Sequence, residues 1–360
     1  MDILIVMSHM GAGGAQKVVA DLANRWSKKG FTVGLATSYG IDDKVALCEN
    51  ISRIYLSKLP TENDILKINF ICSLIKLRKI IIDLKPKYIF SFICPSNIKT
   101  ILACSGIKTP KLIISERNNI ILQTFPKYIK YARKILYKYS DVVTANSIGS
   151  AECMKHFVPV NKIHFIPNPV CIPNIDIDKK MILQKKELKL LYVGRLVAQK
   201  KVEIILHAIN QLLKQGYTFT LTIAGDGPLM PQIKDFCVNN NIEQYINIVG
   251  HVEDVNKYYL DSDIFVLCSD YEGTSNALLE AMSYGLTCIV SNNANISSRI
   301  IVDQKNGIVL KNNNEVELAK ILLDLLKNKN LLNIYGREAR ETCKKYDSET
   351  VYLLWDSLLA

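Results

Sequence analysis

Short apolar segments rich in β-branched residues alternate with amphipathic helical patterns along almost the whole chain. Ile3–Met7 is predicted to be a strand, a glycine-rich turn follows it, and Lys17–Lys28 is predicted to be an amphipathic helix. Because strands joined through helices lie parallel and have both faces covered, the alternation predicts an α/β fold with doubly wound parallel sheets. Further strands are predicted at Phe31–Thr37, Lys87–Phe92, Lys111–Ser115, Val142–Ala145, His164–Ile166, Leu188–Val193, Thr218–Ala224, Ile246–Val249, Ile264–Cys268 and Thr287–Ser291, and further helices at Ile65–Leu84, Lys127–Tyr139, Val202–Gln215, Met230–Asn239, Asn276–Tyr284 and Glu315–Lys327.

The chain is 360 residues long, which is more than one hydrophobic core usually serves, so two domains are expected. The alternation breaks at Ile166–Val170, and a stretch rich in proline and aspartate continues to about Asp178. We therefore predict two Rossmann-like domains, 1–168 and 169–343, that face each other across a cleft. A helix in 344–360 is predicted to return to the first domain.

The charge is uneven along the chain. Residues 1–150 hold 22 Lys and Arg against 10 Asp and Glu, a net charge of +12, whereas residues 151–360 hold 23 against 24, a net charge of −1; the two add to the overall +11. A basic first half indicates an anionic partner, and nucleic acid, anionic lipid or a phosphorylated substrate all fit this charge. A lysine-rich solvated surface without any partner is the alternative.

The remaining composition indicates a cytoplasmic protein. The longest apolar candidate, Ile65–Leu84, is interrupted by four basic residues and one aspartate and is not expected to span a membrane. The first residues lack the basic segment of a signal peptide. Ten cysteines are scattered without a C-x-x-C pair, which predicts reduced thiols and no zinc site or disulfide framework.

A glycine-rich turn, Gly11–Gln16, joins the first predicted strand to the first helix. Glycines let the backbone approach a bulky ligand, and the helix N-terminus offers unpaired amides to an anion. A dinucleotide fingerprint needs glycine in place of Gln16, and no acidic residue ends the second predicted strand, so nicotinamide binding is disfavoured. A tight turn with no ligand stays an alternative.

Two loops of the second half carry further candidates. In Tyr192–Lys201, Arg195 and Lys200 can converge on a diphosphate and so stabilise it as a leaving group, although two exposed loop cations would give the same pattern. Ile223–Leu229 is another glycine turn at a strand end, and His251 with Val252 is expected beside it. A lone histidine in such a place is more often a structural loop residue.

The segment Ser269–Gly285, SDYEGTSNALLEAMSYG, places Glu272 in a turn and Glu280 just over one helical turn into the helix that follows. Each carboxylate oxygen accepts more than one hydrogen bond, so both side chains suit sugar or ribose hydroxyls. All these candidates lie in strand-to-helix loops or at helix starts. Ligands of open parallel sheets bind there, outside the carboxyl ends of the strands.

The ordered motifs GGAQ, GRLxxxK, IAGDGPL and EGTSNALLEAMSYG resemble those of the GT4-type retaining glycosyltransferases of the GT-B fold, and the resemblance covers about residues 2 to 357. Two further runs, Ser91–Asn97 and Lys108–Asn119, resemble the branch that adds hexoses or N-acetylhexosamines to undecaprenyl-diphosphate-linked oligosaccharides in O-antigen, capsule or N-linked glycan assembly.

The resemblance implies a role for particular residues. It implies that Glu272 contacts the donor sugar, that Glu280 holds ribose hydroxyls, and that the second domain binds the nucleotide sugar while the first binds the acceptor. It also implies that Arg195 and Lys200 clamp the diphosphate and are, with Glu272, the catalytic residues. The remaining donor-binding residues implied are Gly13, Gly14, His251, Val252, Gly273, Thr274, Ser275 and Asn276.

The chain departs from the family pattern at three places. Arg117 stands where many members have histidine, Lys200–Lys201 replaces the usual Lys-Gly, and Asn292–Asn295 replaces a Gly-Gly pair. The second difference is expected to alter that turn slightly, and the third leaves the phosphate contacts of its own segment unassigned.

The implied activity is the retaining, metal-independent transfer of GalNAc, Gal or GlcNAc from a UDP-sugar to a lipid-diphosphate-linked saccharide, with no cofactor. Asp261 and Asp263 have D-x-D spacing, as do Asp176 and Asp178. The first pair lies at the wrong end of its strand to hold a donor metal and is interpreted as solvated. The oligomeric state is left open.

The segment Pro126–Tyr139 mixes basic with aromatic and aliphatic residues at helical spacing. Such a helix can bind an anionic membrane surface, which predicts a peripheral protein on the inner face of the membrane, or it can bind the diphosphate of the acceptor. A core-packed helix with a solvated basic face is the alternative. The possible acceptor-side residues are Arg117, Lys127, Lys130, Arg133 and Lys134.

Two other functions stay open. A UDP-sugar 2-epimerase shares the two-domain shape, but the order of the GRLxxxK motif and the two glutamates argues against it. A basic nucleic-acid or lipid-binding protein without enzymatic activity would explain the charge. No helix-turn-helix, RNP-like or zinc pattern supports nucleic-acid binding, so no nucleic-acid partner is expected.

Overall fold

The computed structural model divides into two compact units, each described here by itself. Unit 1 comprises Met1–Asn168 with Tyr352–Ala360, and unit 2 comprises Pro169–Val351. The structure describes residues 1–11, 13–38, 45–57, 66–107, 110–117, 120, 125–176, 187–294 and 299–360. Residues Lys108, Asn118, Asn119, Asp178 and Asn295, which the sequence motifs include, lie outside the described residues.

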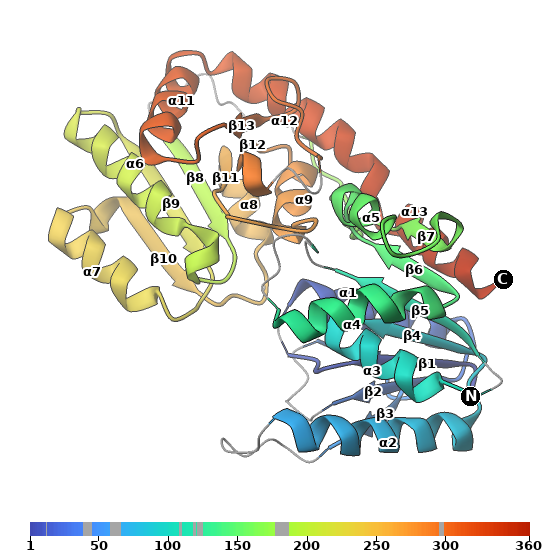
Figure 1. The fold of residues 1–360 in the computed structure, drawn as a ribbon. Helices are drawn as coiled ribbons and strands as arrows, with labels where there is room; N and C mark the ends of the chain where they lie inside the picture. Colours follow the sequence, from blue (N-terminus) through green and yellow to red (C-terminus); the bar gives the residue numbers. More distant parts are fainter. Residues whose placement is uncertain are drawn as a thin grey trace. The chain divides into compact units, whose positions relative to one another are not determined.

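Unit 1 is built on a seven-stranded parallel sheet (Figure 1). Its strand order is β3-β2-β1-β4-β5-β6-β7, and Ile5 of β1 lies opposite Leu35 of β2 and Phe90 of β4. The strands are β1 (Ile3–Met7), β2 (Val33–Thr37), β3 (Ser52–Tyr55), β4 (Tyr88–Phe92), β5 (Lys111–Glu116), β6 (Val142–Ala145) and β7 (Ile163–Phe165).

Helices cover both faces of this sheet. Alternate residues of each strand point to opposite faces, and both sets pack against helices. Leu4 and Val6 of β1 belong to the same buried cluster as Ile98 of α3. On the other face, the ring of Phe90 lies 4.5 Å from that of Trp26 in α1 and 6.2 Å from that of Trp355 in α13. The helices are α1 (Gly14–Lys28), α2 (Leu66–Leu84), α3 (Cys94–Cys104), α4 (Lys127–Leu136) and α5 (Ile148–Met154), and the C-terminal α13 (Ser348–Asp356) belongs to this unit from Tyr352 onward.

Unit 2 repeats the plan on a six-stranded parallel sheet of order β10-β9-β8-β11-β12-β13 (Figure 1). Leu190 and Leu191, neighbours in β8, belong to separate buried clusters, so both faces of this sheet are buried too. The strands are β8 (Leu188–Val193), β9 (Phe219–Ala224), β10 (Ile246–Gly250), β11 (Ile264–Leu267), β12 (Thr287–Ser291) and β13 (Ile308–Leu310), and the helices are α6 (Val202–Lys214), α7 (Met230–Asn240), α8 (Asn256–Asp261), α9 (Asn276–Ser283), α11 (Glu315–Lys327) and α12 (Asn330–Cys343).

Glycines bring two loops of unit 2 into backbone contact at the carboxyl edge of its sheet. A Cβ atom on Gly225 would lie 1.8 Å from the carbonyl oxygen of Gly194, and one on Gly227 would lie 2.5 Å from that of Leu196. The amide of Leu196 also donates a 2.9 Å hydrogen bond to the carbonyl of Asp226. The IAGDGPL glycines are therefore required by the packing of the loop after β9 against the loop after β8.

The predicted architecture of two parallel-sheet α/β units is confirmed, but several elements were missed. Strand β3 is an edge strand without a buried residue, so its sequence lacks an apolar run. Helix α3 was missed because it buries polar residues, among them Asn97 and Thr100, where an amphipathic pattern has apolar ones. Helices α5, α8 and α12 and strand β13 were also not predicted. Within the described residues, no helix has both the length and the apolar character needed to cross a membrane.

Candidate functional site

The loop between β11 and α9 carries Glu272 and ends in a capped helix start. Ser275 is the N-cap of α9, and its hydroxyl accepts a 3.4 Å hydrogen bond from the amide of Leu278. Gly273 and Thr274 are buried within the loop, while Ser275 and Asn276 are half-buried. The helix start therefore presents backbone amides beside Glu272, at the carboxyl edge of the sheet.

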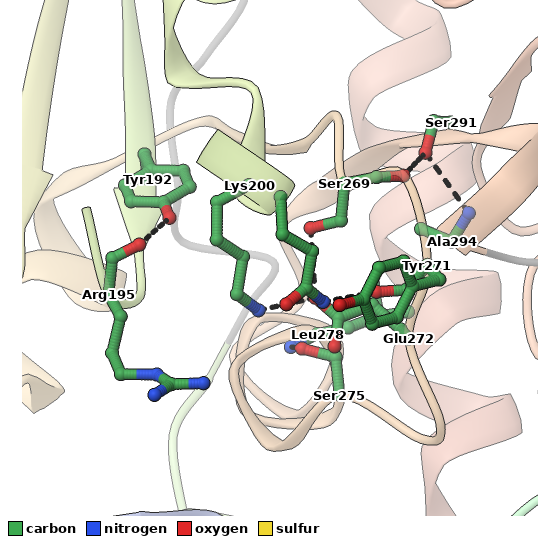
Figure 2. A network of polar contacts seen from close by, with 11 residues as sticks. Tyr192, Arg195, Lys200, Ser269, Tyr271, Glu272, Ser275, Leu278, Ser291 and Ala294 are labelled. Atoms are coloured by element: carbon green, nitrogen blue, oxygen red, sulfur yellow. Dashed lines mark hydrogen bonds and ion pairs between the residues drawn. The ribbon is translucent and has the colours of Figure 1, made fainter. Parts of the chain in front are cut away.

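Glu272 is paired in the structure with Lys200, which follows β8 (Figure 2). The Nζ atom of Lys200 and the hydroxyl of Ser269 both donate to the Oε1 atom of Glu272, the hydroxyl at 2.8 Å. Each charged side chain is 13% exposed. Partial burial strengthens the attraction between the two charges while a ligand can still reach them.

Two hydrogen bonds of Gln199, one from its side chain and one to its backbone, join the loop after β8 to the Glu272 loop. The side chain of Gln199 donates to the carbonyl of Tyr271 at 2.6 Å, and the amide of Asp270 donates to the carbonyl of Gln199 at 2.8 Å. Lys201 adopts a left-handed conformation with φ of 51°, which turns the chain into α6. Lys201 stands where the family usually has glycine after the motif lysine. The turn is therefore kept, although a residue with a side chain is strained in this conformation.

Arg195 lies on the same loop with its backbone fixed and its side chain exposed. The buried Tyr192 donates its hydroxyl to the carbonyl of Arg195 at 2.9 Å. The guanidinium of Arg195 makes no hydrogen bond or ion pair with any residue that the structure describes. In Figure 2 the side chains of Arg195 and Lys200 extend from the loop toward the same side. An arginine held by its backbone and unpaired at its head suits an anionic ligand.

Glu280 is oriented by a buried tyrosine from a neighbouring helix. The hydroxyl of Tyr259 in α8 donates to the Oε2 atom of Glu280 at 2.9 Å, and the Tyr259 ring stacks on that of Tyr284 with centroids 5.3 Å apart. Burial, together with the charge of Glu280, raises the pKa of Tyr259 well above its usual value. Tyr259 therefore stays protonated and acts as a donor to the carboxylate.

The other predicted residues of unit 2 and the glycine turn of unit 1 make fewer contacts. His251 is exposed directly after β10, the edge strand two positions from β8, and Val252 beside it is half-buried. Gly13 is the N-cap of α1, and a Cβ there would lie 2.3 Å from the Oε1 atom of Gln16; Gly14 is the first residue of the helix. The side chain of Gln16 thus covers Gly13.

The D-x-D pair at the opposite edge of the sheet was interpreted as solvated, and this is wrong for Asp263. Asp263 is 1% exposed, and its carboxylate accepts a 3.1 Å hydrogen bond from the amide of Lys189 at the start of β8. Asp261 pairs with the Lys189 ammonium at 3.0 Å. Within the described residues, no three histidine, cysteine or acidic side chains gather in a way that would hold a metal ion.

Two arginines predicted to face the acceptor are buried in unit 1. Arg117 donates to the carbonyl of Ile166 at 3.3 Å and to the side chain of Asn168, and its guanidinium lies 5.7 Å from the Trp355 ring centroid. Burial lowers its pKa to about 9. Arg133 donates to the carbonyl of Ile120 at 3.2 Å. Two nitrogens of Arg117 and one of Arg133 thus donate to protein atoms, and burial keeps both guanidinium groups away from the surface.

A buried polar network, missed by the sequence analysis, surrounds Arg133. Its Nη1 atom lies 3.9 Å from Glu116 at the end of β5, and the hydroxyl of Tyr137 donates to the same carboxylate oxygen. Asn97 of α3 donates to Tyr137 at 3.1 Å. Burial raises the pKa of Glu116 to about 7, against the opposing influence of Arg133 and Tyr137. The sequence signal was the charged pair Glu116–Arg117 directly after an apolar strand.

Helix α4 presents a mixed basic and aromatic face. Tyr128 and Tyr131 are each 69% exposed. Lys127 and Lys134 are exposed, and Lys130 is half-buried. The buried Arg133 on the opposite side fixes which face of the helix points outward.

Two α/β units on parallel sheets match the architecture of the GT-B glycosyltransferases, and family models identify the chain as a glycosyltransferase. The model "Glycosyltransferase Family 4" matches residues 12–172, and "Glycosyl transferases group 1" matches residues 174–342. The chain therefore belongs to the GT4-type glycosyltransferases.

Two relatives support this membership, and one solved structure has the same fold. The chain is 26% identical over 364 residues to a GalNAc-α-(1→4)-GalNAc-α-(1→3)-diNAcBac-PP-undecaprenol α-1,4-N-acetyl-D-galactosaminyltransferase of Campylobacter jejuni, covering 100% of this chain and 98% of the relative. It is 27% identical to a UDP-Gal:α-D-GlcNAc-diphosphoundecaprenol α-1,3-galactosyltransferase of Escherichia coli, over 58% of each chain. Sucrose-phosphate synthase from Thermosynechococcus elongatus has the same fold, with a TM-score of 0.83 at 17% identity, covering 99% of this chain and 98% of the other.

Proposed function

We propose that the chain transfers a hexose or an N-acetylhexosamine from a UDP-sugar to a lipid-diphosphate-linked saccharide, with retention of the anomeric configuration. The observation that carries the proposal is the Lys200–Glu272 pair at the carboxyl edge of the second sheet, beside Arg195, whose guanidinium has no partner among the residues that the structure describes. Two cations suit a diphosphate, and a carboxylate that is partly exposed suits the hydroxyls of a sugar. The acceptor class is supported by the relatives, both of which are named for undecaprenol-linked diphosphate saccharides.

The chemistry assigned to the site is electrostatic. The acceptor hydroxyl attacks the anomeric carbon from the side of the leaving group, and the bond from that carbon to the β-phosphate oxygen breaks with its electron pair on the oxygen. The proton of the hydroxyl passes to the departing diphosphate. Arg195, Lys200 and the amides at the start of α9 stabilise the negative charge that develops there, so no metal is required in this scheme.

Calorimetry tests the binding of the donor nucleotide, and NMR tests the anomeric configuration of the product. We expect UDP to bind in the absence of divalent cations, and the Arg195→Ala variant to bind it more weakly. The anomeric coupling constant of the product should show the same configuration as the donor. Donor epimerised in the absence of acceptor, or an inverted product, would contradict this function.

The lipid-linked acceptor is expected in the membrane. The exposed face of α4 is proposed to contact the membrane surface. Tyr128 and Tyr131 offer amphipathic rings, and Lys127 and Lys134 offer charge to anionic headgroups, each cation contributing about 1 kcal/mol near the surface. We place the protein on the inner face of the cytoplasmic membrane for this reason.

Liposome flotation tests the membrane contact. Wild-type protein should float with vesicles containing anionic lipid at low salt and be released at high salt. The Lys127→Glu, Lys134→Glu double variant should remain in the soluble fraction. The Lys214→Glu, Lys327→Glu double variant, with both exposed lysines in unit 2, is the control with the same change of charge. Flotation of the α4 double variant at the wild-type level would contradict the assignment of α4.

A further inference from the structure

We propose that Ser269 is a positioning residue for Glu272, and that Ser291 in turn fixes Ser269. The inference rests on the proposed function, because it describes how the sugar-contacting carboxylate of that site is held during donor binding. Nothing in the motif pattern singled out either serine. Figure 2 shows both hydroxyls in a continuous set of hydrogen bonds that ends on Glu272.

The two oxygens of Glu272 have different surroundings. Lys200 and Ser269 both donate to Oε1, the hydroxyl of Ser269 at 2.8 Å. The Oε2 atom receives no hydrogen bond from any residue in the described part of the chain. One oxygen is thus held by the protein, and the other can accept a hydrogen bond from a sugar hydroxyl.

Donor binding changes the partners of only one of the two groups that hold Oε1. In the proposed function Lys200 interacts with the diphosphate, which competes with Glu272 for the ammonium group. Ser269 is neutral and fully buried, so a phosphate cannot draw it away. Its hydroxyl therefore keeps Glu272 oriented when Lys200 turns toward the diphosphate.

Ser269 is fixed in its turn by the adjacent strand. Ser291 at the end of β12 is fully buried, and its hydroxyl donates to the carbonyl of Ser269 at 2.6 Å. The same hydroxyl accepts a 3.1 Å hydrogen bond from the amide of Ala294, so both its donor and an acceptor site are used. Leu267 pairs with Val290 in the parallel ladder, which places Ser291 beside the start of the Glu272 loop.

The segment after Ser291 is where the chain lacks the Gly-Gly pair of the family. Here Ser291 is followed by Asn292, Asn293 and Ala294, which form the start of a helical turn. The Ala294 amide fixes the Ser291 hydroxyl, so this chain supports the Glu272 loop through its own local sequence. A second amide, from the side chain of Asn313, donates to the carbonyl of Cys268 at 3.0 Å and supports the same loop.

The first test compares three serine variants in the full-length protein by steady-state transfer and by UDP calorimetry. For Ser269→Ala we expect kcat to fall about 10-fold or more, because a hydrogen bond to a charged acceptor is lost, while the Kd for UDP changes less than about twofold. Ser269→Thr keeps the hydroxyl and should recover most of kcat. Ser262→Ala removes an equally buried hydroxyl, bonded to the Tyr258 carbonyl at the amino end of β11, and should match the wild type.

The second test does not require turnover. Ser269 and Lys200 share one oxygen of Glu272, so a double-mutant cycle of Ser269→Ala with Lys200→Met should be non-additive in urea unfolding. The expected coupling corresponds to about a threefold or larger factor in the unfolding equilibrium constant. The Ser291→Ala variant should lower kcat by about threefold, in the same direction as Ser269→Ala.

The outcomes separate this inference from the proposed function. If wild-type protein transfers the sugar and Ser269→Ala has wild-type kcat, or loses UDP affinity as strongly as kcat, the positioning role is wrong while the proposed function stands. If wild-type protein neither binds UDP nor transfers any sugar from a UDP donor, the proposed function is wrong and the role falls with it. Additive unfolding free energies in the double-mutant cycle would also overturn the role.

Discussion

At the carboxyl end of β11 in unit 2, Glu272 and Lys200 form an ion pair in which each side chain keeps 13% of its surface exposed. At the carboxyl end of β5 in unit 1, Glu116 is fully buried and lies 3.9 Å from Arg133, whose side chain is 5% exposed. Burial raises the pKa of Glu116 to about 7. Both pairs sit at the same edge of equivalent parallel sheets, but only the first is accessible to a ligand.

The difference teaches how two similar sheets support different tasks. In unit 2 the ionic groups are partly solvated, so in the proposed function an incoming diphosphate and sugar can replace their present partners. In unit 1 the ionic groups are enclosed by α3, β5 and α4 and are paired with protein atoms. A buried ion pair is costly to break, so the contact between Arg133 and Glu116 holds α4 against β5.

The largest expected effect is on the accessible pair. Glu272→Gln keeps the size of the side chain but removes its charge, and we expect kcat to fall by at least about 100-fold because the contact to the donor sugar is lost in the transition state. The unfolding midpoint in urea should stay close to that of the wild type. The exposed Glu243→Gln is the matched control, and equal activity of the two variants would contradict the assignment of Glu272.

A substitution in the buried Glu116–Arg133 pair should lower the free energy of unfolding and leave the affinity for UDP unchanged. Arg133→Met leaves Glu116 buried without its guanidinium, which should lower the free energy of unfolding by about 3 kcal/mol. Urea unfolding measures the loss, with the exposed Lys134→Met as control. Calorimetry should show unchanged UDP affinity for the folded variant; a weaker affinity without loss of stability would reverse the comparison between the two edges.

A smaller effect is expected for Arg195, whose side chain has no partner among the described residues to leave unpaired. Arg195→Ala should weaken UDP binding by about 1.5 to 3 kcal/mol, the range for hydrogen bonds to charged groups, and leave stability unchanged. Calorimetry with UDP measures the change, and Lys214→Ala on α6 controls for the loss of one positive charge. Unchanged affinity would remove Arg195 from the diphosphate site.

The last effect concerns pH and is the smallest per measured step, because it is spread over several pH units. The pKa of Glu116 is raised from 4.5 to about 7 in the folded state, so the folded chain holds a proton that the unfolded chain has released across this window. The free energy of unfolding contributed by this group therefore falls as pH rises from 4.5 to 7, by at most about 1.4 kcal/mol per pH unit. Urea unfolding at several pH values should show a shallower decline for Glu116→Gln than for wild type. The exposed Glu152→Gln should keep the wild-type slope.

Much of the fold followed from sequence because strand and helix periods are local. The apolar strands β1, β8 and β11 were predicted from their own residues, and Glu272, Lys200 and Arg195 followed from short motifs in the loops after such strands. Strand β3 and helix α3 were missed, since one is an exposed edge strand and the other buries polar side chains.

The contacts that orient these residues could not be predicted in the same way. The residues that form these hydrogen bonds are far apart in the sequence. Tyr137 is 21 positions from Glu116 and 40 from Asn97, and Ser291 is 22 positions from Ser269. Such pairs depend on which strands and helices become neighbours. A serine or tyrosine at these positions carries no periodic signal of its partner.

The most direct test of the account is a transfer assay with a panel of UDP-sugars and synthetic undecaprenyl-diphosphate saccharides, read by mass spectrometry. We predict that one UDP-hexose or UDP-N-acetylhexosamine extends the lipid-linked saccharide by the mass of that sugar, and that Glu272→Ala yields no such product. A panel in which no UDP-sugar extends the acceptor, or in which Glu272→Ala extends it as fast as wild type, would contradict the account.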